Sequence, residues 1–280
     1  FDFRGHKFQG DWQAALGVSV RVPHLAFLSM EGEAKRDYPA SIGYQSPWYK
    51  EYKYVEDHFA RLNTALVRGR PLVSVAVIHP VESYWLHWGP ARETAAVRDQ
   101  IETNFQNITR WLLFANIDFD YICESLLPQQ YDAAAGGDAR LHVGKMAYRT
   151  VIVPACETLR SSTVRALEEF RACGGRLIFL GACPSHIDAL PDTEGRIRTL
   201  YDLSCAMPFE KEAIICALYD DRDIEVEGAE NMLYRMRCDG KDKWLFLTHG
   251  LKPADKDQPC RQDITVAVRG LYAPLLYDTQ

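Results

Sequence analysis

The chain has 280 residues, of which 47% are hydrophobic and 25% charged, and its formal net charge at pH 7 is −6. This length exceeds what one small core holds, and this composition is that of a globular protein, which argues against long disordered regions. The acidic balance without a cluster of Lys and Arg argues against a nucleic-acid partner. The apolar runs are too short to cross a membrane, so we expect no membrane partner either.

The first 70 residues predict a helix, a strand, a loop and a second helix. The run at 11–16 predicts the end of a helix, and Gly17 is placed to cap it. The run VSVRVPHLAFLSM at 18–30 predicts a strand, and apolar residues at three- and four-residue steps predict a helix over 47–69. This order is that of the last units of a β/α barrel. We therefore interpret residues 1–70 as the C-terminal part of such a barrel, whose loops after the strands carry the active site.

The next part of the chain alternates short apolar runs with amphipathic helices. Buried strands are expected near 72–79, 150–154 and 176–181, and the intervening sequence predicts helices near 92–115 and 161–175. Alternation at this spacing is typical of a doubly wound, flavodoxin-like α/β domain with a parallel sheet. We expect this domain to cover residues 71–205 and the three strands to be neighbours in one sheet.

The last part, residues 206–280, predicts a β-rich domain that is incomplete. Residues 231–250 read as a hairpin whose turn contains Asp239 and Gly240. The chain begins without an initiator Met or a signal peptide and stops in a strand-like run, so we expect a piece of a longer protein.

Eight cysteines are spread singly along the chain, with no C-x-x-C pair. This spacing does not predict a structural zinc site, and we expect neither a metal ion nor another cofactor in this chain. Several of the cysteines lie in apolar stretches, where a free thiol behaves as a small hydrophobic side chain. The pattern predicts a reduced protein with a cytoplasmic location.

Three stretches follow one another in an order that is also found in a known enzyme family. They are ALGVSVRVPHLAFLSMEGEAKRDYP with YQSPWYKEYKYVEDHFARLNTAL, then PLVSVAVIHPVESYW with FDYICESLL, then YRTVIVPACETLRSSTVRALEEFRACGGRLIFLGACPSHIDAL. In this order they resemble glycoside hydrolase family 106, the α-L-rhamnosidase-like enzymes. The first stretch resembles the end of the catalytic barrel. The other two resemble the following α/β domain, which is akin to the β-galactosidase trimerisation domain and to amidotransferases.

The resemblance implies inverting hydrolysis of terminal deoxy-sugar, α-L-rhamnoside-like linkages, with calcium in the full-length parent. One protonated carboxyl would serve the leaving oxygen while a second activates water across the ring. The barrel strands that would supply these carboxyls are expected upstream of residue 1, so no catalytic residue is assigned here. The fragment is then mainly a non-catalytic accessory domain, and carbohydrate is the partner of its parent. The alternative is a stand-alone, degenerate amidotransferase-like module for binding or oligomerisation, with a homo-oligomer as one arrangement.

Candidate substrate-binding residues follow from the expected barrel and sheet. Charged and planar polar groups on the loop after the strand at 18–30 can hydrogen-bond sugar hydroxyls, and aromatic residues after the first α/β strand lie where ligands approach such sheets. The alternative is a solvated loop with surface charges. The candidates are His24, Glu31, Arg36, Asp37, Trp85 and Trp88.

Two other patterns have simpler interpretations. Cys183 follows a buried strand, with His186 three residues later, as a nucleophile does in amidotransferases. A cysteine nucleophile needs a base and oxyanion donors, yet the second glycine of that turn and a distant histidine are missing, so we interpret the stretch as architecture. Asp118, Asp120 and Glu124 offer oxygen ligands that would suit calcium, but a solvated strand face is the commoner outcome.

Overall fold

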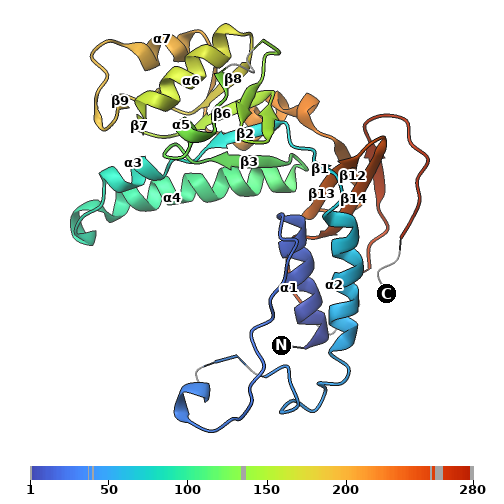
Figure 1. Ribbon diagram of the computed structural model, residues 1–280. Coiled ribbons are helices and arrows are strands. Elements are labelled where there is room, and N and C mark those ends of the chain that lie inside the picture. Colours follow the sequence, from blue (N-terminus) through green and yellow to red (C-terminus); the bar gives the residue numbers. More distant parts are fainter. Residues whose placement is uncertain are drawn as a thin grey trace. The chain divides into compact units, whose positions relative to one another are not determined.

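The computed structural model describes residues 2–36, 38–39, 41–133, 137–252, 254–255 and 261–277 (Figure 1). It divides into two compact units. The first comprises Phe1–Leu72, Glu227–Thr265 and Gly270–Gln280, and the second comprises Val73–Val226 and Val266–Arg269. The C-terminal segment therefore shares a unit with the first 72 residues. The division into three consecutive domains stays a prediction.

The second unit is built on a parallel sheet of five strands in the order β11-β8-β6-β2-β3. The strands are β2 (Val75–Ile78), β3 (Phe119–Ile122), β6 (Thr150–Pro154), β8 (Arg176–Leu180) and β11 (Cys205–Met207). Of the strands in this sheet, β2 comes first in the chain and lies between β3 and β6, the second and third, which is the flavodoxin-like order. This confirms the predicted fold class, and the three strands predicted as neighbours are adjacent as β2, β6 and β8.

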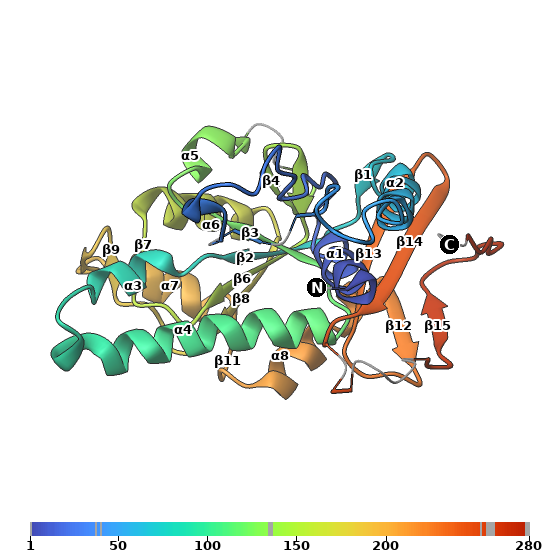
Figure 2. The same ribbon diagram turned by 90° about the horizontal axis from the view of Figure 1, so that it is seen from below.

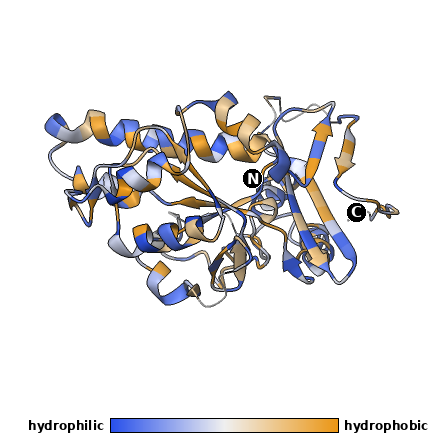
Figure 3. Cartoon of the chain, turned by 90° about the horizontal axis from the view of Figure 1, so that it is seen from above, coloured by the Kyte–Doolittle hydropathy of each residue, from blue (hydrophilic) through white to orange (hydrophobic). Residues whose placement is uncertain are grey.

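Both faces of this sheet are covered, because successive side chains of a strand point to opposite faces. In β2, Val75 and Val77 pack in one apolar cluster, whereas Ala76 and Ile78 pack in another. The clusters are completed by helices: α4 (Ala91–Phe114) and α8 (Lys211–Ala217) on one face, α6 (Ser161–Ala172) and α7 (Arg196–Asp202) on the other. Figure 2 shows α4 and α8 on one side of the sheet and α6 on the other. Burial on both faces explains why the inner strands β2, β6 and β8 are rich in apolar residues, which Figure 3 shows in the centre of the sheet.

Shorter elements surround this sheet. They are α3 (Val81–Leu86), α5 (Leu127–Gln130), β4 (Leu141–Val143), β5 (Met146–Tyr148), β7 (Thr158–Leu159), β9 (His186–Ile187), β10 (Leu190–Pro191), η3 (Tyr219–Asp221), β12 (Ile224–Glu227) and β15 (Thr265–Val268). The strands β7, β9 and β10 form a small sheet of their own, in which β7 and β9 are parallel.

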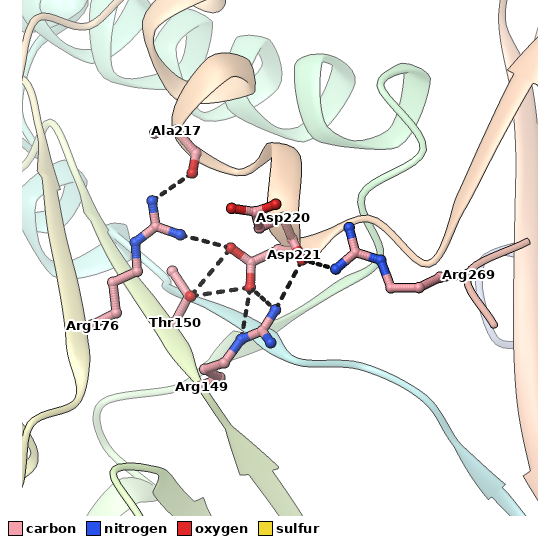
Figure 4. A network of polar contacts seen from close by, with 7 residues as sticks. All are labelled: Arg149, Thr150, Arg176, Ala217, Asp220, Asp221 and Arg269. Atoms are coloured by element: carbon pink, nitrogen blue, oxygen red, sulfur yellow. Dashed lines mark hydrogen bonds and ion pairs between the residues drawn. The ribbon is translucent and has the colours of Figure 1, made fainter.

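The amino end of the sheet is closed by a buried ionic network around Asp221 (Figure 4). The Asp221 side chain is 0% exposed and accepts hydrogen bonds from Arg149 (2.6 Å), Arg176 (2.9 Å) and the Thr150 hydroxyl (3.2 Å). Thr150 and Arg176 are the paired first residues of β6 and β8. Arg269 donates to the carbonyl of Asp220 at 2.9 Å. The network therefore ties the start of two central strands to η3.

The first unit is a helical pair packed on a hairpin. Helices α1 (Phe3–Ala15) and α2 (Lys53–Leu66) share an apolar core, and β13 (Met232–Asp239) pairs antiparallel with β14 (Asp242–His249) and with β1 (Arg70–Pro71). The hairpin turn at Asp239 and Gly240 is confirmed. Helix α1 ends just before Gly17, whose φ of 110° suits the predicted cap. The second predicted helix begins later than expected, since turns occupy residues 47–52.

The predicted strand at 18–30 is wrong. This segment forms neither helix nor strand, and its residues alternate between exposed and half-buried. Val20 is 73% exposed, Val22 87% and Leu28 98%, whereas Arg21 on the opposite side stacks on Phe59 at 3.8 Å. A strand requires a neighbouring strand to satisfy its backbone groups. The described part of the first unit supplies no such ladder to this segment, although the Leu25 carbonyl accepts the Ile42 N–H at 3.1 Å.

Candidate functional site

The carboxyl ends of the parallel strands gather polar side chains at one edge of the second unit. Strand β2 leads into α3, β6 leads into Glu157, and β8 leads into the turn that carries Cys183 and His186. Ligands meet flavodoxin-like sheets at this edge. The edge is therefore the place to search for a site in this unit.

Glu157 is the centre of this edge. Its Oε2 lies 2.6 Å from Nε2 of His87, and its Oε1 lies 3.8 Å from Nδ1 of His186. The Glu157 side chain is 40% exposed, and the two imidazoles are 29% and 27% exposed. These groups can donate to and accept from the hydroxyls of a ligand. We call Glu157, His87 and His186 the polar triplet.

Helix α3 is fixed against the triplet by two contacts. The buried hydroxyl of Ser83 accepts the backbone N–H groups of Glu157 at 2.9 Å and Thr158 at 3.2 Å. Arg160 binds Glu82, also on α3, through a hydrogen-bonded ion pair. The start of α6 is thereby tied to α3, which fixes the backbone of Glu157 beside the helix that leads into His87.

Glu124 lies buried beneath this edge. It follows β3, is 3% exposed, and its Oε2 accepts the backbone N–H of Arg160 at 2.8 Å, at the start of α6. Burial raises the pKa of Glu124 to about 7, and the hydrogen bond from Arg160 lowers the pKa by less. The predicted solvated face is wrong for this residue, because the carboxylate caps a helix inside the unit.

The other predicted metal candidates do not converge on Glu124. Asp120 accepts a hydrogen bond from the Tyr148 hydroxyl at 2.9 Å, and the described residues contain no group of three or more His, Cys, Asp or Glu side chains arranged to hold a metal ion.

Seven cysteines within the described ranges are free thiols. No described helix is long and apolar enough to cross a membrane.

Cys183 has no base aimed at its sulfur. Its thiol donates to the carbonyl of Pro184 at 3.4 Å, and Nδ1 of His186 lies 2.9 Å from the Ser185 hydroxyl. Burial raises the pKa of Cys183, which favours the protonated and unreactive thiol. This geometry supports the interpretation of the turn as architecture.

The two predicted tryptophans lie beside the polar triplet in the chain. Trp85 is 58% exposed on α3 and Trp88 is 72% exposed directly after it. The guanidinium of Arg98, on α4, lies 5.0 Å from the ring centre of Trp88 and 5.8 Å from that of Tyr84. We call Tyr84, Trp85 and Trp88 the aromatic ledge. Its role as a substrate site stays a prediction.

The remaining predicted site residues belong to the first unit. The His24 ring contacts Tyr38 edge-on at 5.5 Å, and the backbone N–H of Glu31 donates to the Ser29 hydroxyl at 3.0 Å. Arg36 is the last residue of the short helix η1 (Glu33–Arg36), and Asp37 lies outside the described residues. Sugar binding by these four residues stays a prediction.

Sequence reasoning missed Glu157 and Ser83 as members of a site. A signal was present, since Glu157 closely follows the apolar strand at 150–154 and His87 follows the first strand. The carboxyl ends of adjacent parallel strands meet at one edge, so residues 70 positions apart become partners.

Comparison with known proteins identifies the fold. A GH42 β-galactosidase from G. stearothermophilus, solved as a catalytic mutant, superposes with a TM-score of 0.53 at 12% identity, over 78% of this chain and 41% of that chain. An apo exo-carrageenase GH42 from Bacteroides ovatus gives a TM-score of 0.46 at 8% identity, over 79% and 28%. No family model matches the sequence, and no curated protein is similar to it in sequence.

The first of these likenesses shows the fold. This chain has an α/β fold that is also found within a GH42 glycoside hydrolase, and it spans 41% of the length of that enzyme. The finer resemblance to family 106 stays a prediction.

Proposed function

We propose that this chain is part of a glycoside hydrolase that cleaves terminal deoxy-sugar, α-L-rhamnoside-like linkages, and that its α/β unit is a non-catalytic accessory domain. The fold shared with a GH42 β-galactosidase supports the glycosidase assignment at a coarse level. The rhamnoside specificity rests on the sequence resemblance alone.

One observation carries the proposal: the unpaired extended segment at 18–30 between α1 and α2. Helix, extended run and helix is the order of a β/α barrel unit. Val22 and Leu28 are left 87% and 98% exposed, which is the state of a strand whose neighbours come from elsewhere. The segment is therefore proposed to be a barrel strand that pairs with strands outside this sequence.

The α/β unit is proposed to be non-catalytic because its edge lacks the machinery of cleavage. Inverting hydrolysis needs two carboxyls about 6.5–9.5 Å apart around a sugar. At the carboxyl edge of the sheet, Glu157 is engaged by His87, and Glu124 is buried as a helix cap. A binding or oligomerisation module without any catalytic parent is the second candidate, and the exposed Trp85 and Trp88 favour it.

The test compares the 280-residue chain with the longest natural polypeptide that contains it, at equal concentration. Aryl α-L-rhamnosides and aryl β-D-galactosides are the substrates. We expect rhamnoside hydrolysis by the longer polypeptide and none by the 280-residue chain. Turnover by the shorter chain equal to that of the longer one would refute the accessory role. Hydrolysis of galactosides alone would refute the specificity, and inactivity of both would favour the binding module.

A further inference from the structure

The aromatic ledge presents more apolar surface to water than its residue types normally do. Trp85 and Trp88 are 58% and 72% exposed and stand three residues apart. The backbone N–H of Trp88 bonds the carbonyl of Trp85 at 3.0 Å, which continues the helical turn, so residues three apart share a face. Exposed aromatic groups that are clustered mark surfaces that bind a partner.

The ledge is rigid. Arg98 lies over the rings of both Trp88 and Tyr84, and the Tyr84 and Trp88 ring centres are 6.4 Å apart. Below it, the Ser83 hydroxyl and the Arg160–Glu82 pair fix α3 to the loop that carries Glu157. Preorganised groups bind with a smaller loss of conformational entropy than mobile ones.

The polar groups beside the ledge define the chemistry of the ligand. His87 stands between Trp85 and Trp88 in the chain, and its Nε2 lies 2.6 Å from Glu157. A carboxylate paired with an imidazole accepts and donates hydrogen bonds, which suits hydroxyl groups. The Glu157 carboxylate disfavours an anionic group at its own position, and the net charge of −6 acts in the same direction. The Arg98 charge lies over the aromatic rings instead.

We propose that the aromatic ledge and the polar triplet form a binding site for an uncharged pyranose unit. The C–H face of the sugar ring would lie on the indole of Trp88 or Trp85, and its hydroxyls would bond Glu157 and His87. All residues of this site lie in the α/β unit. The proposal rests on the proposed function only for the choice of a sugar as the ligand.

The experiment measures binding by the 280-residue chain, which needs no hydrolysis. Methyl α-L-rhamnopyranoside and methyl β-D-galactopyranoside are the probes, followed by saturation-transfer NMR and by tryptophan fluorescence. The variants are Trp88→Ala, Trp85→Ala and Glu157→Gln. The matched control is Trp12→Ala, because Trp12 is also exposed, at 39%, but lies on α1 in the first unit.

We expect saturable binding of at least one probe that weakens at least tenfold in Trp88→Ala or Trp85→Ala and less in Glu157→Gln, with Trp12→Ala unchanged. Equal weakening in Trp12→Ala, or no binding of either sugar, would overturn the proposal. Concentration-dependent self-association that shields Trp85 and Trp88 from a fluorescence quencher would also overturn it, because a second copy would then be the partner. Hydrolysis by the longer polypeptide is a separate readout, so either proposal can fail alone.

Discussion

Two apolar segments of this chain differ in burial and in strand pairing. In β2, all four residues from Val75 to Ile78 are buried between β3 and β6 and under helices on both faces. In the segment 18–30, Val22 is 87% exposed and the backbone has no ladder partner among the described residues. Local sequence encodes an extended conformation in both. Only β2 has neighbouring strands among the described residues, and only β2 is a strand.

The largest expected effect comes from placing the same charge in both segments. Val77→Asp puts a carboxylate at a side chain that is 0% exposed, so we expect a loss of more than about 4 kcal/mol in the free energy of unfolding. Val22→Asp lies in solvent and should change this free energy by less than about 0.5 kcal/mol. Urea unfolding followed by circular dichroism measures both. Similar losses in the two variants would mean that the 18–30 segment is packed.

The second effect concerns the ionic network around Asp221 at the amino end of the parallel sheet. Asp221→Ala removes the buried partner of Arg149, Arg176 and Thr150, and we expect a loss of about 3–5 kcal/mol. Arg149→Ala is the control, since its side chain is 52% exposed and Arg176 still neutralises Asp221, so about 1–2 kcal/mol is expected. Thermal unfolding of both variants compares them. An equal loss would show that the network does not centre on Asp221.

The third effect concerns Glu124, near the carboxyl end of the sheet strands, and depends on pH. Because burial raises the folded-state pKa of Glu124 to about 7 from 4.5, its contribution is most favourable below about pH 4.5 and is lost as pH rises through about 7. The span amounts to about 3 kcal/mol. Urea unfolding at pH 5 and pH 8 should show this pH dependence in the natural chain and a smaller one in Glu124→Gln. Glu93→Gln, whose side chain is 61% exposed, should keep the full dependence. An unchanged dependence in Glu124→Gln would contradict the assignment.

The inner strands of the sheet could be predicted from the sequence because burial on both faces requires continuous apolar runs. Continuous apolar runs such as 150–154 need no long-range information to be recognised as buried parallel strands. The hairpin turn at Gly240 was equally readable, because its φ of 62° favours glycine.

Residues whose role depends on contacts distant in sequence could not be read in this way. Glu124 looks like one of three surface carboxylates, and only the arrival of α6 turns it into a buried cap. Glu157 becomes part of a cluster only when β2 and β6 bring His87 beside it. The prediction of a strand at 18–30 failed for the complementary reason, since the local pattern alternates as a strand does but no described segment pairs with it.

Hydrogen exchange of the backbone amides of residues 19–30 tests the central claim most directly. Among the described residues, the hydrogen bonds of this segment involve its carbonyls, as when Ile42 donates to Leu25 at 3.1 Å, and its backbone N–H groups pair with no strand. We predict fast exchange in the 280-residue chain, with β2 strongly protected, and protection of residues 19–30 by at least about 100-fold in the longest natural polypeptide that contains them. Protection in the 280-residue chain equal to that of β2, or continued fast exchange in the longer polypeptide, would contradict the account.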